Sequence, residues 1–285
     1  MQVAFLVGLL AAIFALFIGR VQEGLKAEFG RRRGLVWLAP AALTVYFAAA
    51  SLAAGGVERE LLLIMLAYTA APVACAFWRG SDFLTIALLW LPLEFPALAA
   101  RLIAKHSQGF LHSVAYGIAI VLGLTLFACF RGISGMKINR PREWRDAGRA
   151  LAGFALTAPV LAAVGIAIGF IPMPHLPTAG AGKMAGAAGI ILAGTALPEE
   201  ILFRSMIQNL MMQRWGGSRW VLIAASVIFG AAHLDNGPQT TPNWRYMILA
   251  TIAGFAYGRV FQASTTVLAS ALFHMMVDWT KHFFF

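Results

Sequence analysis

Long apolar runs follow one another along almost the whole chain. Ten of them are long enough, or nearly long enough, to cross a membrane as a helix, which takes roughly 20 residues. None shows the alternation of a strand. We therefore expect an all-α polytopic membrane helix bundle of about ten transmembrane helices, or as few as eight, because two runs are short. The runs are 2–18, 34–55, 61–78, 83–104, 110–130, 150–171, 184–212, 219–235, 244–262 and 264–283.

The composition supports a membrane protein and weakens other classes. The chain is 60% hydrophobic and 12% charged, whereas soluble domains have about 25% charged residues. Its net charge of +10 indicates basic cytoplasmic loops rather than nucleic-acid binding. Cys75 and Cys129 lie in apolar runs without metal-site spacing, so we read them as small buried hydrophobes.

Two basic segments suggest an orientation. The predicted loops 19–33 and 131–149 hold five and six basic residues and should both face the cytoplasm, which puts the N-terminus outside. The first run has no basic residues before it, so we expect a retained helix rather than a cleaved signal peptide. The expected location is the membrane itself, as in a bacterial inner (plasma) membrane protein.

The same segments divide the chain. We expect an N-terminal transmembrane region of unassigned role at 1–130, a basic cytoplasmic linker at 131–149 and the functional core at 150–285. The linker is interpreted as a positive-inside anchor. The alternative is a short amphipathic helix in the membrane interface, with Trp144 at the level of the headgroups.

The sequence GTALPEEILFRSMIQNLMM places two carboxylates and an arginine in an apolar run. A charged side chain at bilayer depth costs about 2.5–3.5 kcal/mol on insertion scales, so these groups need partners. Glu200 and Arg204 are four residues apart and can pair on one helix face. Glu199 points about 100° away and can face another partner. Pro198 removes a backbone donor and can bend or open the helix beside Glu199.

Two later runs contain histidines at helical spacing. FGAAH has Phe229 and His233 four residues apart, and HMMVD has His274 and Asp278 four residues apart. Each motif alone also fits a structural role, as a packing ion pair, a histidine bonded to a carbonyl, or a capping pair. Ionisable clusters on several spans are functional by default, so together the three motifs indicate a site.

EExxxR, FxxxH and HxxxD, in this order and spacing, resemble the CAAX protease and bacteriocin-processing family of intramembrane proteases, also called Rce1-like or Abi. The resemblance covers roughly residues 150–285. It implies an intramembrane endopeptidase in which Glu199 and His233 activate water and the His274 motif stabilises the oxyanion. Glu200, Arg204 and Phe229 would support these residues.

The sequence departs from the family at one position. The family residue at the end of the last motif is more often asparagine, whereas this chain has Asp278. An ionised aspartate cannot donate to an oxyanion. We therefore expect Asp278 either to be protonated or, as we prefer, to orient His274.

Several alternatives stay open. His233, His274 and Glu199 could instead bind zinc with an open position, although we favour a metal-free mechanism with no cofactor. Intramembrane charges also build proton-coupled transporters, but here they lie in one half of the chain. Glu94, between Pro92 and Pro96, could line the cavity or lie at the membrane interface. The expected partners are the lipid bilayer and a peptide or protein substrate near the membrane.

Overall fold

The computed structural model describes residues 1–94, 108–236 and 242–285, which contain helices and no strand. It divides into two compact units, Met1–Gly135 and Met136–Phe285. The boundary falls inside the segment 131–149. Each unit packs its own set of helices.

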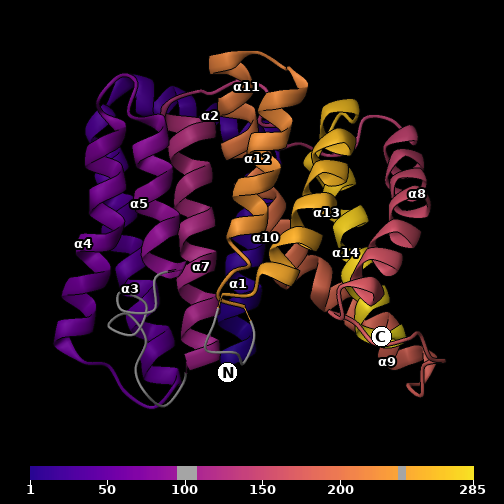
Figure 1. Ribbon diagram of the computed structural model, residues 1–285. Helices are drawn as coiled ribbons and strands as arrows, with labels where there is room; N and C mark the ends of the chain where they lie inside the picture. The colour runs from indigo at the N-terminus through magenta and orange to yellow at the C-terminus, as the bar shows by residue number, and fades with distance from the viewer. Residues whose placement is uncertain (95–107, 237–241) are drawn as a thin grey trace. The chain divides into compact units, whose positions relative to one another are not determined.

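The N-terminal unit is a bundle of apolar helices (Figure 1). Helices α1, α3, α4, α5 and α7 pack around one apolar core, in which Phe47, Met65 and Val114 are completely buried. The unit comprises α1 (Gln2–Ala15), α2 (Gly19–Arg31), the 3₁₀-helix η1 (Arg33–Trp37), α3 (Leu38–Ala53), α4 (Arg59–Ala76), α5 (Asp82–Glu94), α7 (Gln108–Leu124) and the π-helix η2 (Thr125–Phe130).

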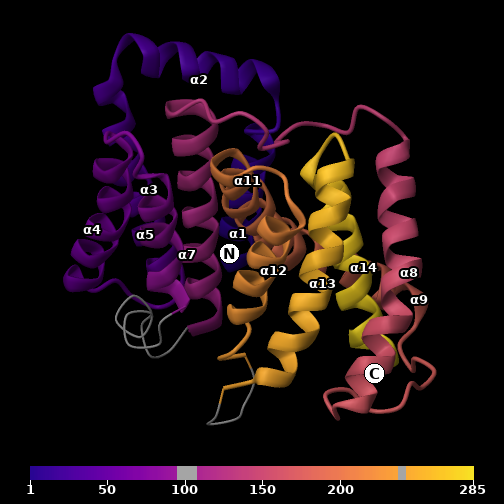
Figure 2. The ribbon, with the colours of Figure 1, turned by 45° about the horizontal axis from the view of Figure 1, so that its top comes forward.

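The first basic segment is helical, which corrects its prediction as a loop. Helix α2 is bent by 81° from α1, and Figure 2 shows it lying across one end of the N-terminal bundle. Its Phe29 is buried, whereas Arg20, Lys26 and Arg31 are exposed. Basic charge indicates contact with water and headgroups, and a helix along the surface provides that contact as well as a loop does.

The segment 131–144 does not form the alternative interfacial helix; α8 begins only at Arg145. The segment is instead attached to the turn between α13 (Trp244–Ala263) and α14 (Val267–Phe284). Lys137 Nζ donates to the carbonyl oxygens of Phe261, Gln262 and Ser264 at 2.6, 3.0 and 2.7 Å. These bonds satisfy carbonyls at the end of α13 that have no partner inside the helix.

The C-terminal unit places two helices at the centre of the site. Helix α13 packs against α12 and α8, and α14 packs against α8, α13 and the long helix formed by α9 to α11 (Figures 1 and 2). The remaining elements are α8 (Arg145–Ala167), α9 (Ala181–Ile191), the π-helix η3 (Leu192–Ala196), α10 (Leu197–Glu200), the π-helix η4 (Ile201–Gln208), α11 (Asn209–Trp215) and α12 (Arg219–Ala231).

The described residues confirm an all-α polytopic membrane bundle, although fewer helices qualify as spans than the sequence predicts. Five are long and apolar enough to cross a membrane, or six if the bent pair α1–α2 is one span. The sequence predicts about ten. Helix α12 has only 13 residues, and the predicted run 83–104 extends into residues outside the described ranges.

Candidate active site

Glu199 and Glu200 lie in the middle of one helix of 35 residues, Ala181–Trp215. The helix is π-helical at η3, which ends two residues before Pro198, and directly after Glu200 it is π-helical again at η4. In a regular α-helix the proline ring clashes with the carbonyl four residues earlier. A wider π-turn relieves that clash, so the helix opens locally and continues. Such turns are frequent at functional sites.

Glu200 and Arg204 form the predicted pair, and both side chains are fully buried. Arg204 Nε donates to Glu200 Oε2 at 3.1 Å, and Arg204 Nη1 donates to Gln208 Oε1 at 3.4 Å. Gln208 in turn donates to the carbonyl of Gly258 on α13 at 3.1 Å. The guanidinium carbon lies 4.8 Å from the ring centre of Phe229 on α12. The pair therefore connects the long helix to α12 and α13.

His274 lies among three carboxylates. Its Nδ1 is 3.2 Å from Glu200 Oε1, and its Nε2 is 3.4 Å from Asp278 Oδ2 and 3.9 Å from Glu199 Oε2. Ser270, one turn earlier on α14, donates to Glu200 Oε2. The sequence predicts the pair of His274 and Asp278. The direct contact between His274 and Glu200 is an addition, because the sequence predicts only the pair of Glu200 with Arg204.

His233 lies two residues beyond the end of α12, although the predicted run 219–235 includes it. Its Nδ1 contacts the carbonyl oxygen of Phe229 at 2.8 Å, and this bond explains the four-residue spacing of the motif. The ring of Phe229 is centred 4.8 Å from the ring of His233 and 5.8 Å from that of His274. Phe229 therefore contacts both imidazoles and fixes their separation.

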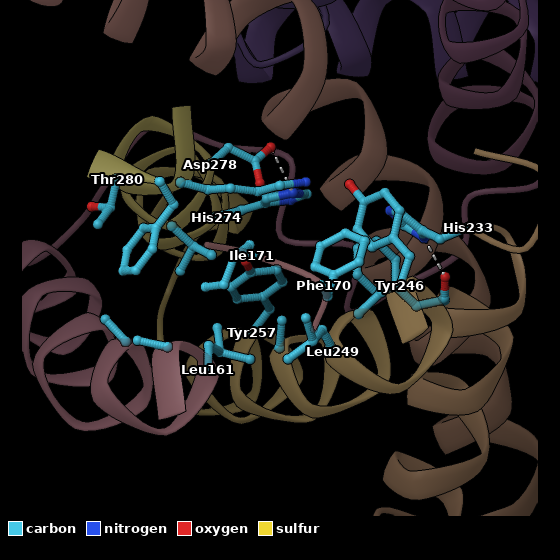
Figure 3. Close-up of a pocket in the computed structure, with 18 residues that line it drawn as sticks. Leu161, Phe170, Ile171, His233, Tyr246, Leu249, Tyr257, His274, Asp278 and Thr280 are labelled. Atoms are coloured by element: carbon cyan, nitrogen blue, oxygen red, sulfur yellow. Dashed lines mark hydrogen bonds and ion pairs between the residues drawn. The ribbon is translucent and has the colours of Figure 1, made fainter. Parts of the chain in front are cut away.

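A cavity of about 90 Å³ joins these side chains. Figure 3 shows His233 and Tyr246 on one side of it and His274 with Asp278 on another. Apolar side chains of α8 and α13, such as Leu161 and Leu249, complete the wall. Three of the four predicted catalytic residues, His233, His274 and Asp278, thus line one cavity. The fourth, Glu199, contacts His274 at 3.9 Å.

Glu94 lies in the other unit, at the end of α5. Its Oε1 accepts a hydrogen bond from Trp90 Nε1 at 2.9 Å. It is not among the residues that line the cavity described here. The structure therefore gives Glu94 a local partner on its own helix, and its role as a cavity residue stays a prediction.

The proposed zinc ligands do not meet as a metal site. In the described ranges no group of three or more His, Cys, Asp or Glu side chains is arranged to hold a metal ion. Both ring nitrogens of His274 face carboxylates, and Nδ1 of His233 faces a carbonyl. Three protein ligands with one open position, as in catalytic zinc sites, are therefore not formed by His233, His274 and Glu199 as they are arranged here.

Sequence reasoning missed several residues of the site. The ring of Tyr257 is stacked on His274, with centres 4.6 Å apart and planes at 21°. Tyr246 is centred 4.6 Å from His233. Ser270 could have been found, because it precedes His274 by the same four residues that separate His274 from Asp278. The two tyrosines carry no such signal, since their contacts depend on how α13 packs.

Comparison with known families identifies the C-terminal segment. Residues 181–280 match the family described as type II CAAX prenyl endopeptidase Rce1-like. No curated protein and no solved structure matches the chain. The matched segment contains all three motifs, EExxxR, FxxxH and HxxxD, and it belongs to a chain with several apolar helices. Residues 181–280 are therefore similar to the Rce1-like family of CAAX-type intramembrane peptidases, in a chain whose several apolar helices indicate an integral multi-pass membrane protein.

Proposed function

We propose that this protein is an intramembrane endopeptidase in which Glu199 and His233 activate the hydrolytic water and His274 binds the oxyanion. The observation that carries the proposal is the environment of His274. One imidazole contacts the carboxylates of Glu200, Asp278 and Glu199 within 3.9 Å and shares a cavity with His233. The family match supports the class of reaction.

The reaction needs a base, an oxyanion donor and an acid. A water molecule adds to the carbonyl carbon of the scissile peptide bond while its proton passes to the Glu199 carboxylate. Negative charge develops on the carbonyl oxygen, and an N–H of His274 donates to it. The C–N bond then breaks, and the proton on Glu199 passes to the leaving nitrogen. The products are a carboxylic acid, which then ionises, and an amine.

The contacts of the two histidines suit different roles. The Phe229 carbonyl can only accept, so Nδ1 of His233 carries a hydrogen and Nε2 of the neutral ring can accept one from water. Nδ1 of His274 is directed at Glu200, so the proposed oxyanion donor is Nε2, whose hydrogen the oxyanion would share with the Asp278 carboxylate 3.4 Å away. His233 therefore suits the water and His274 suits the carbonyl oxygen.

Asp278 is proposed to orient His274. Its Oδ2 lies 3.4 Å from His274 Nε2, and an ionised carboxylate at this distance favours a ring nitrogen that carries a hydrogen. It cannot itself donate to the oxyanion. Asparagine, the commoner family residue, would supply a donor directly. In this chain the Asp278 carboxylate is proposed to orient the His274 imidazole, which then supplies the donor.

The test is cleavage of a peptide library by the purified full-length protein in proteoliposomes, analysed by mass spectrometry. Glu199→Gln and His233→Ala should each lower the rate at least about 100-fold, the usual contribution of general acid–base catalysis. Glu143→Gln and His175→Ala make the same chemical changes outside the proposed site and should cleave like the wild type. Normal cleavage by both Glu199→Gln and His233→Ala would refute the proposed function.

The zinc alternative has its own experiment. The metal content of the purified active protein and the effect of a chelator distinguish the two mechanisms. We expect cleavage to survive chelation. Stoichiometric zinc together with inhibition by the chelator would assign the reaction to a metal and overturn the glutamate mechanism.

A further inference from the structure

Lys281 lies three residues after Asp278 on α14, with its ammonium between two aromatic rings. The Nζ atom is 4.4 Å from the ring centre of Tyr246 and 4.8 Å from that of Phe170. Aromatic faces attract cations at such distances. The two rings therefore hold the charge in a fixed place, whereas an exposed lysine would be free to move.

This charge lies where two hollows meet. Lys281, Tyr246 and Asp278 line both the 90 Å³ cavity of the proposed site and a groove of about 590 Å³. The groove is otherwise lined mainly by α9 and η3, through Ala187, Ile190, Ile191 and Thr195, and by His282. Its wall is thus apolar along α9 and η3, and the α14 side carries the Lys281 ammonium together with Asp278, whose carboxylate is engaged by His274.

No carboxylate of the described residues forms an ion pair with Lys281, since none lies within 4.0 Å of Nζ. Asp278, on the same helix, is paired with His274 at 3.4 Å. The aromatic rings stabilise the ammonium but do not neutralise it. A charge in a largely apolar environment is expected to have an anionic partner, and the groove leaves room for one from outside the chain.

We propose that Lys281 binds a carboxylate of the peptide substrate and so selects which peptides are cleaved. This inference rests on the proposed function. Three residues of helix separate Lys281 from Asp278, a rise of about 4.5 Å, and an extended peptide covers about 3.3 Å per residue. The recognised carboxylate should therefore lie within about three residues of the scissile bond. It is either the C-terminal carboxylate or the side chain of Asp or Glu.

The experiment compares matched peptides. Each library peptide is made with a free C-terminal acid or an amide, and with Glu or Gln near the cleavage position. The wild type should cleave acid members about 10- to 100-fold faster than their neutral partners, the range expected for a hydrogen bond between charged groups. In Lys281→Met this ratio should fall to about one, and Lys281→Arg should keep most of it. The arm that shows the preference identifies the source of the carboxylate.

Lys183→Met is the matched control, because Lys183 is exposed on α9 and lines neither hollow. It should keep the wild-type ratio. A wild type without acid preference, or a Lys281→Met variant that loses acid and neutral peptides equally, overturns the proposal. The same peptides are also titrated by fluorescence polarisation onto Glu199→Gln with and without Lys281→Met. If acid peptides bind tenfold more tightly than neutral ones, and only when Lys281 is present, the carboxylate subsite is supported even if the wild type cleaves no peptide. The absence of cleavage would then count against the proposed function and not against the subsite.

Discussion

Replacing Glu200 with glutamine should destabilise the C-terminal unit by about 3–5 kcal/mol, the range for breaking a buried ion pair. Both partners have no exposed side-chain surface. The Glu200 carboxylate accepts from Arg204 and Ser270 on Oε2 and from His274 on Oε1. Glutamine offers one acceptor oxygen, so a donor must face its amide NH₂. One lost bond to a charged group accounts for about 1.5–3 kcal/mol, and the uncompensated Arg204 charge adds the rest.

The free energy of unfolding can be measured on purified full-length protein in detergent micelles, by titration with SDS and tryptophan fluorescence. Glu143→Gln is the matched control. Its partner Arg149 lies 3.5 Å away, and their side chains are 32–44% exposed, so its loss should cost less than about 1 kcal/mol. The double variant Glu200→Leu/Arg204→Leu removes both charges. It should cost less than the sum of the costs of Glu200→Leu and Arg204→Leu made separately, because no lone buried charge remains.

Two results would refute this reasoning. One is a cost for Glu200→Gln as small as that for Glu143→Gln, because the carboxylate would then be accessible to water. The other is strict additivity in the Glu200 and Arg204 cycle. Additivity would mean that the two side chains do not interact, although the structure puts Arg204 Nε 3.1 Å from Glu200 Oε2.

Three further changes test other parts of the C-terminal unit. Lys137→Met removes three bonds to carbonyls and should lower the free energy of unfolding by about 2–4 kcal/mol; an unchanged SDS midpoint would contradict this. Gly230→Ala puts a methyl group 2.7 Å from the carbonyl oxygen of Met247 and should cost about 1–3 kcal/mol, whereas Gly186→Ala meets nothing within 4 Å and should be neutral or stabilising. Asp278→Asn should lower the cleavage rate about tenfold if the carboxylate orients His274; a higher rate would show that a donor is needed there.

Most helices could be predicted from the lengths of the apolar runs. The run 244–262 matches α13 (Trp244–Ala263), and the run 184–212 matches the long helix Ala181–Trp215. The errors occur where the polarity of a segment does not predict whether the segment is helical. Basic residues marked 19–33 as a loop although an amphipathic helix forms there, and apolarity extended 219–235 past the end of α12 at Ala231.

Within the site, contacts along one helix were predictable and most contacts between helices were not. Spacing by four residues pairs Glu200 with Arg204 and His274 with Asp278, and both pairs occur. The contact from Glu200 to His274 joins residues 74 positions apart. It depends on how α14 packs against α10, which the pattern of one sequence does not specify.

The exposure of the two glutamates argues for different roles. Glu200 is fully buried and accepts from three donors, two of them on α14. Each donor stabilises the carboxylate as an acceptor and makes it less suited to take a proton from water. Glu199 has 22% of its side chain exposed, although its Oε2, which lies 3.9 Å from His274 Nε2, is itself buried. A change at Glu199 should therefore stop the reaction and leave the fold intact, whereas a change at Glu200 should disturb both, because Glu200 holds Arg204 and His274 together.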